Sequence, residues 1–283
     1  MRTDTIIIKA AVAVALALMP LCTAAQTVRG DFNMDGQVNI SDVTSFINYL
    51  LSGKPAQELP DCYETVTVNG VSFVMVMVQG GTYMRELGTS WTVDDFSIGQ
   101  TEVTIELWNA VMGGTPQDNM MSFPQNPVEY VSWDDCQEFI AQLNALTGRT
   151  FRLPSDSEWE YAACGGRLTL AYTYAGSNDI NEVAWYRGNI PALDPNVPYS
   201  YVTRTQPVAT KLPNELGLYD MSGNVEEWCQ SNRLTPGLTD SSALRGGSAD
   251  PNCNDNGACC KVTSNKIMPH DRKDRYIGFR LAL

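Results

Sequence analysis

The sequence predicts a domain that combines helices and strands with long irregular stretches, preceded by a small N-terminal helical segment built on a calcium loop. Three observations predict this. An apolar, partly alternating run from Val66 to Val78 is typical of a strand, whereas Ser132 to Leu146 carries apolar residues at helical spacing. From Gly165 to Leu283 the chain is rich in Gly, Pro, Asn and Asp, which predicts tight turns rather than long helices.

The N-terminus has the layout of a secretory signal peptide that ends at Ala25. Arg2 and Lys9 precede an apolar run from Ala10 to Leu21, and small residues follow. This run is too short to span a bilayer, and no later run reaches about eighteen apolar residues. We therefore expect an exported protein, secreted, periplasmic or at the cell surface, without a membrane-spanning helix. Cys22 leaves a lipoprotein as the alternative.

The composition is acidic, with 32 Asp and Glu against 19 Lys and Arg and a net charge of −13. A nucleic-acid partner is not expected, because neutralising phosphates requires a basic surface. The chain has eight cysteines, and removal of the leader with Cys22 leaves seven. Export favours disulfides, and an odd number leaves at least one thiol outside an internal pair.

A calcium-binding loop is predicted from Asp31 to Asp42. Oxygen-bearing side chains stand at loop positions one, three, five, nine and twelve, position seven offers its backbone carbonyl, and Gly36 at position six makes the sharp turn. The predicted ligands are Asp31, Asn33, Asp35, Gln37, Asn39 and Asp42. An apolar helical face and the linker Ser52 to Pro55 follow the loop.

This segment, residues 26–60, resembles one repeat of a dockerin, the calcium-bound module that attaches secreted enzymes to scaffold proteins. The resemblance implies a cohesin-type scaffold as partner. Dockerins normally carry two packed repeats, whereas only one is present here, and Asp42 replaces the Glu that intracellular sensors use at position twelve. We therefore expect weak, structural calcium binding by a stabilising or tethering appendage.

The helices of the larger domain are marked by their caps. Ser132 is suited to cap the helix that runs to Leu146, and Gly148 follows its end. A second helix is predicted from Asp156 to Cys164, with Ser155 and Glu158 at the spacing of a capping box.

Residues 64–283 contain a series of different short motifs. They are Asn69–Phe73 with Gly80–Met84, Thr101–Thr104, Asn126–Val128 with Val131–Trp133, Arg152–Pro154 with Glu158–Ala162, Gly217–Val225 with Glu227–Trp228, Arg245–Ser248 and Ile277–Arg280. In this order they resemble the formylglycine-generating-enzyme domain, also called the sulfatase-modifying-factor domain. The resemblance implies an α+β fold related to C-type lectins, with little regular secondary structure and with bound calcium.

The resemblance also implies a calcium site in this domain. Its ligands would be the side chains of Asp220 and Glu227 and the carbonyl oxygens of Gly223 and Val225. Hard oxygen donors from a tight loop suit this ion, and the alternative is that Glu227 only caps or pairs locally. Glu226 stands where the family usually has tryptophan. The family's other calcium site is not expected, because apolar Val183 and Ala184 stand where a ligand asparagine should begin.

The family's enzyme oxidises a cysteine of a client sulfatase with molecular oxygen and a copper(I) ion, held by two thiolates. The positions of that cysteine pair are occupied here by Pro251 and Asn256. Cys253, Cys259 and Cys260 lie nearby at other spacings, and they are weak candidates for a shifted copper pair. A disulfide, or free thiols in a loop, is the expected alternative.

His270 is the only histidine, so the three-histidine iron site of the family's ergothioneine-synthesising relatives cannot form. We expect His270 to be a solvated surface residue rather than a catalytic base. The sequence offers neither a glycine-rich phosphate loop nor a paired-histidine zinc motif.

Three functions are consistent with these features. The first is a non-catalytic, lectin-like domain that binds a protein or glycan through the polar segment from Ala249 to Tyr276, because retroelement-diversified receptors vary the same segment of this scaffold. The second is the copper-dependent oxidase that converts a sulfatase cysteine to formylglycine. The third is a dockerin-borne accessory protein in polysaccharide breakdown.

Overall fold

The computed structural model describes residues 63–84, 90–116, 123–190, 205–230, 239–250 and 257–283. The chain divides into two compact units, with the boundary between Glu64 and Thr65. The signal peptide and the predicted calcium loop, Asp31 to Asp42, lie outside the described residues. Within the described parts of the chain, no helix is both long and apolar enough to cross a membrane.

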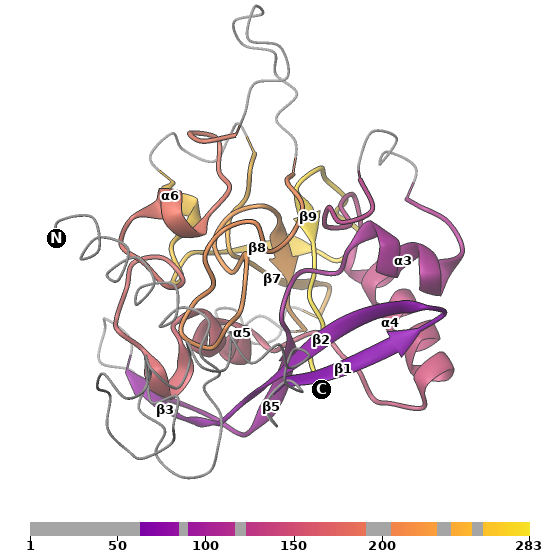
Figure 1. Cartoon of the computed structure of the whole chain (residues 1–283), viewed down its shortest axis with the longest axis horizontal. Coiled ribbons are helices and arrows are strands. Elements are labelled where there is room, and N and C mark those ends of the chain that lie inside the picture. The colour runs from indigo at the N-terminus through magenta and orange to yellow at the C-terminus, as the bar shows by residue number, and fades with distance from the viewer. Residues whose placement is uncertain (1–62, 85–89, 117–122, 191–204, 231–238, 251–256) are drawn as a thin grey trace, which may run out of the picture. The chain divides into compact units, whose positions relative to one another are not determined.

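A three-stranded sheet has the order β1-β2-β5 and consists of β1 (Tyr63–Val68), β2 (Val71–Val78) and β5 (Phe96–Gly99). The run from Val66 to Val78, predicted as one strand, is a hairpin whose two arms are visible in Figure 1. Asn69 and Gly70 form its turn with φ of 48° and 85°. The Asn-Gly pair is favoured there because both turn residues need positive φ. Next to this sheet in sequence, β3 (Gly81–Met84) pairs antiparallel with β4 (Ser90–Val93).

Two helices follow their predicted bounds closely. Helix α4 (Trp133–Thr147) begins with a capping box between Ser132 and Asp135 and ends at Gly148, which is left-handed. Helix α5 (Asp156–Ala163) begins with the predicted capping box of Ser155 and Glu158. The caps satisfy backbone N–H groups that a helix start leaves without partners. These local sequence signals therefore locate the start of each helix.

Helix α3 (Ile105–Met112) was not predicted from the sequence. Its cap is Thr104, whose hydroxyl accepts a hydrogen bond from the Leu107 amide, and Gly113 ends it with φ of 76°. The remaining short elements are η1 (Gly166–Leu168), α6 (Ile180–Val183) and η2 (Ala258–Cys260). Most of the chain after Gly165 is irregular in the described residues, as predicted.

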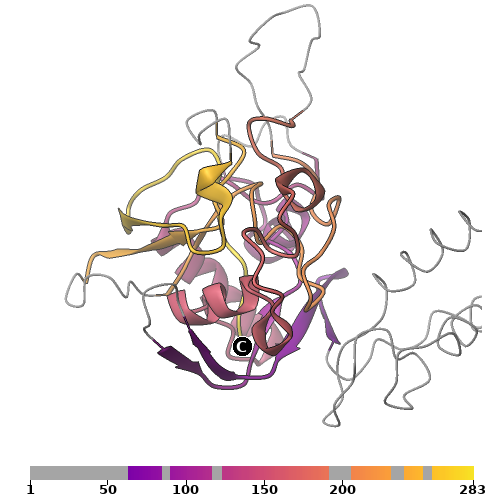
Figure 2. The ribbon, with the colours of Figure 1, turned by 90° about the vertical axis from the view of Figure 1, so that its left-hand side faces the viewer.

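A second sheet of order β8-β7-β6-β9 lies in this region. It contains β6 (Glu226–Trp228), β7 (Ser241–Arg245), β8 (Asn265–Pro269) and β9 (Ile277–Gly278). Glu227 of β6 faces Arg245 of β7 on one side and Gly278 of β9 on the other. In Figure 2 the indigo and purple strands lie below the pink helices, and the orange strands extend to the left above these helices.

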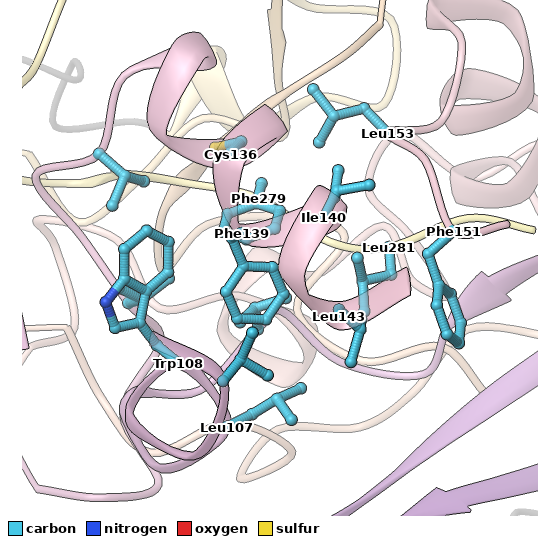
Figure 3. Packing of buried hydrophobic residues seen from close by; sticks show 14 of the residues in the cluster. Leu107, Trp108, Cys136, Phe139, Ile140, Leu143, Phe151, Leu153, Phe279 and Leu281 are labelled. Carbon is cyan, nitrogen blue, oxygen red and sulfur yellow. The ribbon is translucent and has the colours of Figure 1, made fainter. Parts of the chain in front are cut away.

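The hydrophobic core joins helices α3 and α4 to the segment that contains Phe279. Trp108 of α3 stacks on Phe139 of α4 with ring centroids 5.2 Å apart, and Phe139 meets the edge of Phe279 at 5.3 Å (Figure 3). Stacked and edge-to-face pairs add to the stabilisation that burial gives. This packing fixes the backbone that carries the next residue, Arg280, into the centre of the domain.

A buried ion pair ties α5 to the second sheet. Arg245 of β7 donates from Nε to the Asp156 carboxylate at 2.5 Å and lies 2.8 Å from Glu160 Oε2, and all three side chains are buried. Arg245 also donates to the backbone carbonyl of Ser264. A charge removed from water needs such partners, so these bonds fix where α5 lies on the sheet.

Candidate functional site

The centre of the domain holds three buried carboxylates and one guanidinium. Glu227 and Arg280 are 0% exposed, and Glu102 and Asp220 are each 2% exposed. Arg280 binds Glu227 with two hydrogen bonds, Nε to Oε2 at 2.6 Å and Nη2 to Oε1 at 2.7 Å. The indole N–H of Trp159 donates to the same Oε2 at 2.7 Å. Both oxygens of Glu227 are therefore engaged by protein donors.

Arg280 also holds two segments from earlier in the chain. Its Nη1 donates to the Gly99 carbonyl at 3.0 Å, and its Nη2 donates to the Tyr219 carbonyl at 2.9 Å. The planar guanidinium presents five donors in fixed directions, which suits it to join a carboxylate and several carbonyls at once. One side chain thus links β5, β6 and the loop before Asp220.

Glu102 fixes the loop that leads into β6. Its Oε1 accepts from the Val225 amide at 3.1 Å, and its Oε2 accepts from Asn224 Nδ2 at 2.7 Å. Asn224 has φ of 62° and accepts from the Gln206 amide through Oδ1 at 2.9 Å. The loop therefore takes its shape from a carboxylate far away in the sequence. Glu102 was not predicted as a site residue, although it lies within the motif Thr101–Thr104.

Gly223 is required by a close approach. Its φ is 84°, and a Cβ atom at this position would lie 2.3 Å from the Trp185 carbonyl oxygen. The Gly223 amide donates to the Gly246 carbonyl at 2.9 Å. Only glycine fits a position with positive φ and backbone on both sides.

Asp220 has one oxygen without a hydrogen-bond partner. Oδ2 accepts from the Ala209 amide at 2.7 Å, whereas Oδ1 is buried and has no hydrogen bond within the described part of the chain. Burial is the main cause that raises the pKa of Asp220 to about 6, and nearby Glu227 adds to it. Burial also raises the pKa of Glu102 well above its usual value, with contributions from Asp220 and Glu227. The cluster has more negative charge than Arg280 alone neutralises.

The predicted calcium ligands lie close together in the chain. They are Asp220, Gly223 and Val225 in one loop and Glu227 in β6, which follows that loop. The uncompensated Asp220 Oδ1 fits a cation, since a buried oxygen without a donor needs one. Glu227 fits less well, because Arg280 already pairs with it. No three His, Cys, Asp or Glu side chains among the described residues form a group that could hold a metal. Carbonyl oxygens would have to complete the shell, which calcium accepts.

The other predicted positions are placed as follows. Val183, the last residue of α6, and Ala184, which follows it, are both buried. Glu226 of β6 forms an ion pair with Lys266 of β8. Cys253 lies outside the described residues, as do Pro251 and Asn256.

The two described candidate cysteines do not form a pair of thiolates. Cys259 is disulfide-bonded, and Cys260 is 0% exposed with its Sγ 3.5 Å from that of Cys259. Burial raises the pKa of the Cys260 thiol to about 12, so it carries its proton near neutral pH. Copper(I) binds thiolate sulfur, and a disulfide sulfur is not a thiolate.

His270 is engaged in packing. Its ring stacks on Trp133 with centroids 4.1 Å apart and planes 9° apart, and its Nε2 lies 2.9 Å from Ser242 Oγ. Ser242 is 1% exposed, so this serine is not accessible as a nucleophile. His270 therefore differs from the solvated surface residue that the sequence predicted, because Trp133 offers it a flat apolar face.

The described part of the chain is thus an α+β domain with a buried Arg–Glu pair at its centre and little regular structure after Gly165. The model of the sulfatase-modifying factor enzyme 1-like domain matches residues 53–283, and this chain belongs to that family. A chaperone protein, LppX of Paenibacillus barcinonensis, is 33% identical over an alignment of 207 positions, and the match covers 56% of this chain and 71% of that protein.

Two further relatives carry the family's enzyme name. The formylglycine-generating enzyme of Thermomonospora curvata is 35% identical over 43% of this chain and 38% of its own length. The inactive C-alpha-formylglycine-generating enzyme 2 of Bos taurus is 32% identical over 55% of this chain and 50% of its own length. This chain thus spans half or less of these two proteins.

Solved structures share the fold. Treponema denticola variable protein 1 superimposes with a TM-score of 0.65 at 26% identity, covering 78% of this chain and 98% of that one. The crystal structure of CarF gives a TM-score of 0.57 at 26% identity, covering 74% of this chain and 97% of that one. The expected α+β fold of this family is confirmed.

Replacing Arg280 tests the buried charge cluster. We expect Arg280→Met to lower the free energy of unfolding by about 3–5 kcal/mol, because it leaves buried carboxylates uncompensated. Chemical denaturation with urea measures this. Lys273→Met is the control, since Lys273 pairs with Asp135 at a partly exposed site and should cost less than about 1 kcal/mol.

The double variant Arg280→Met with Glu227→Gln gives a second readout. Removing both charges should cost less than the two single substitutions together, because the two residues are in direct contact. Strict additivity of the two costs would contradict the assigned pairing.

Proposed function

We propose that this chain is an exported, non-catalytic ligand-binding module of the sulfatase-modifying-factor type, with a lectin-like mode of binding. The state of its cysteines carries the proposal. The family's copper positions hold Pro251 and Asn256 in the sequence, Cys259 is disulfide-bonded and Cys260 is a buried thiol. His270 stacks on Trp133, and the Ser242 hydroxyl beside its Nε2 is buried, so this pair offers no accessible nucleophile.

The names of similar proteins support this reading. One relative is called an inactive formylglycine-generating enzyme, another a chaperone, and a protein of the same fold is called a variable protein. Each is a name for a protein that carries the domain without being called an active oxidase. A scaffold can keep its fold while its site changes function.

The proposed ligand surface is the segment from Ala249 to Tyr276. Its described part contains η2 and β8, the end strand of the second sheet, and Lys261 and Thr263 between them are exposed. The segment is anchored at both ends, because Arg245 is held by Asp156 and Arg280 by Glu227. Exposed polar residues on a rigid support are suited to bind a protein or a glycan.

A direct test measures binding of the purified chain to arrays of glycans and of exported proteins. Binding of variants to any ligand found is then compared with the wild type. The double variant Lys261→Ala with Thr263→Ala should lower the affinity for the ligand at least about tenfold, since a hot spot contributes more than about 1 kcal/mol. The matched control is Asp134→Ala with Glu138→Ala, two exposed residues of α4. Both variants should keep the wild-type melting temperature. Loss of binding in the α4 variant alone would place the surface elsewhere.

The oxidase alternative is tested by its chemistry. Purified chain loaded with copper(I) is incubated in air with a Cys-x-Pro-x-Arg peptide, and the peptide mass is followed. We expect no change at the cysteine, because Cys259 and Cys260 do not provide two thiolates. The Thermomonospora curvata enzyme serves as the positive control. Conversion by this chain, lost on replacing Cys259 or Cys260 by serine, would overturn the non-catalytic assignment.

We also propose that calcium binds at Asp220 and at the N-terminal loop from Asp31 to Asp42. The buried Asp220 Oδ1 without a donor supports the first site, and ligand spacing in the sequence supports the second. At Asp220 the ion would add positive charge beside Glu102 and Glu227 and would hold the loop that enters β6. The binding of a scaffold protein by a single dockerin-like repeat stays a prediction.

Calorimetric titration with calcium separates the two sites. The full chain should bind two ions, and Asp220→Asn should bind one. The matched variant Asp31→Asn with Asp35→Asn should lose the other. In EDTA, Asp220→Asn should be more stable than the wild type, because it removes a buried carboxylate that lacks a full set of partners. An unchanged titration with Asp220→Asn would exclude calcium at that residue.

A further inference from the structure

The turn of the β1–β2 hairpin is an asparagine followed by a glycine. Asn69 and Gly70 are both exposed and have φ of 48° and 85°. A Cβ atom built on Gly70 would meet no atom within 4 Å. The peptide bond between the two residues is therefore crowded neither by a side chain at Gly70 nor by a packed neighbour on that side.

The side chain of Asn69 caps the end of helix α3. Its Nδ2 donates to the Ala110 carbonyl at 2.7 Å. The last four carbonyl groups of a helix have no partner within it. Among those of α3, the Asn109 carbonyl accepts from the Gly113 amide, and the Ala110 carbonyl accepts from Asn69. The amide group of Asn69 thus joins the hairpin to the helix.

We propose that Asn69 is a site of spontaneous deamidation and that this modification loosens the hairpin from α3. The backbone nitrogen of Gly70 attacks Cγ of Asn69, and a new C–N bond closes a five-membered succinimide ring. Nδ2 leaves as ammonia and takes the proton that the Gly70 nitrogen loses. Water then adds to one of the two ring carbonyls and opens the ring, which leaves aspartate or isoaspartate at position 69 and releases one proton. Water is the only co-reactant, and no electrons are transferred.

Both products remove the cap of α3. A carboxylate has no hydrogen to donate to the Ala110 carbonyl. It also brings a negative charge to the C-terminal end of a helix, which is the negative end of the helix dipole. Isoaspartate in addition lengthens the backbone within the turn that sets the register of β1 and β2.

The folded chain allows this reaction through a local opening of the turn. Ring closure requires the Asn69 side chain to rotate, so its bond to Ala110 must break first. That bond lies at the surface, where local opening costs less than global unfolding. Beside the turn, the hydroxyl groups of Thr67 and Ser72 are 2.8 Å apart across the hairpin and help to keep the strands paired. We therefore expect the native chain to react, but more slowly than a free peptide.

Peptide mapping of the full chain tests the reaction. The purified protein is incubated in a mildly alkaline buffer, digested at low pH and analysed by mass spectrometry, and isoaspartate is measured with an isoaspartyl methyltransferase. A synthetic peptide with the sequence of residues 67–73 is treated in the same way. Asn178 is the internal control, because it is exposed but is followed by Asp179, whose side chain crowds the attacking nitrogen. The expected order of rates is the peptide first, Asn69 of the native chain second and Asn178 last.

Two matched variants test the effect on the fold. Asn69→Asp reproduces one product, and its unfolding equilibrium constant in urea should rise about tenfold, as for the loss of one hydrogen bond. Asn178→Asp should stay close to the wild type, because the Asn178 side chain accepts from the Thr173 amide and a carboxylate oxygen accepts equally well. Amide hydrogen exchange in β1 should be faster in Asn69→Asp than in Asn178→Asp.

Three results would overturn the proposal. One is an unmodified Asn69 in the native chain after the peptide has reacted completely, or a rate no higher than that of Asn178. The second is conversion only in step with labelling of the Cys136 thiol, which is 0% exposed and reports global unfolding. The third is an Asn69→Asp variant as stable as Asn178→Asp, which would show that the cap of α3 does not hold the hairpin.

Discussion

The pairing of Arg280 with Glu227 is the interaction on which the centre of this domain depends. An unpaired charge in the interior would cost about 3–5 kcal/mol, a large part of the net stability of a domain, so each charged group there needs partners. Arg280 joins β5, β6 and the loop before Asp220, and Trp159 of α5 completes the shell of Glu227. The aromatic packing around Phe279 supports the backbone next to Arg280. The irregular segments of the domain thereby acquire a fixed geometry.

Strand β6 carries two adjacent buried carboxylates. Successive residues of a strand point to opposite faces, so Glu226 and Glu227 have different surroundings although they are neighbours. Glu227 faces Arg280 and the charge cluster, whereas Glu226 pairs with Lys266 and lies near Cys260. The two neighbouring carboxylates therefore belong to separate ion pairs.

The elements that were predictable from the sequence are those with local signals. Capping residues located α4 and α5 to within a residue or two, and the series of short motifs indicated the family. The hairpin of β1 and β2 was missed because the apolar run hid the turn at Asn69. The second sheet was missed because its strands have two to five residues, too few to show a period.

The candidate site was predictable only in part, because its partners are distant in the sequence. Asp220 and Glu227 were named from one motif, but Glu102 bonds Val225 across 123 residues, and no local pattern marks that contact. The engagement of Glu227 by Arg280 likewise emerges only in three dimensions. The state of Cys259 could not be inferred either, since seven cysteines outside the leader allow many pairings.

The contact between Arg280 Nη1 and the Gly99 carbonyl spans 181 residues. Closing so long a loop costs conformational entropy before the contact gives any stabilisation, and domains rich in such contacts fold slowly. During synthesis, a chain that has not yet reached residues 277–283 has Glu102, Asp220 and Glu227 without their guanidinium. These carboxylates would keep water, so the interior of the domain can close only as the last-made part of the fold docks.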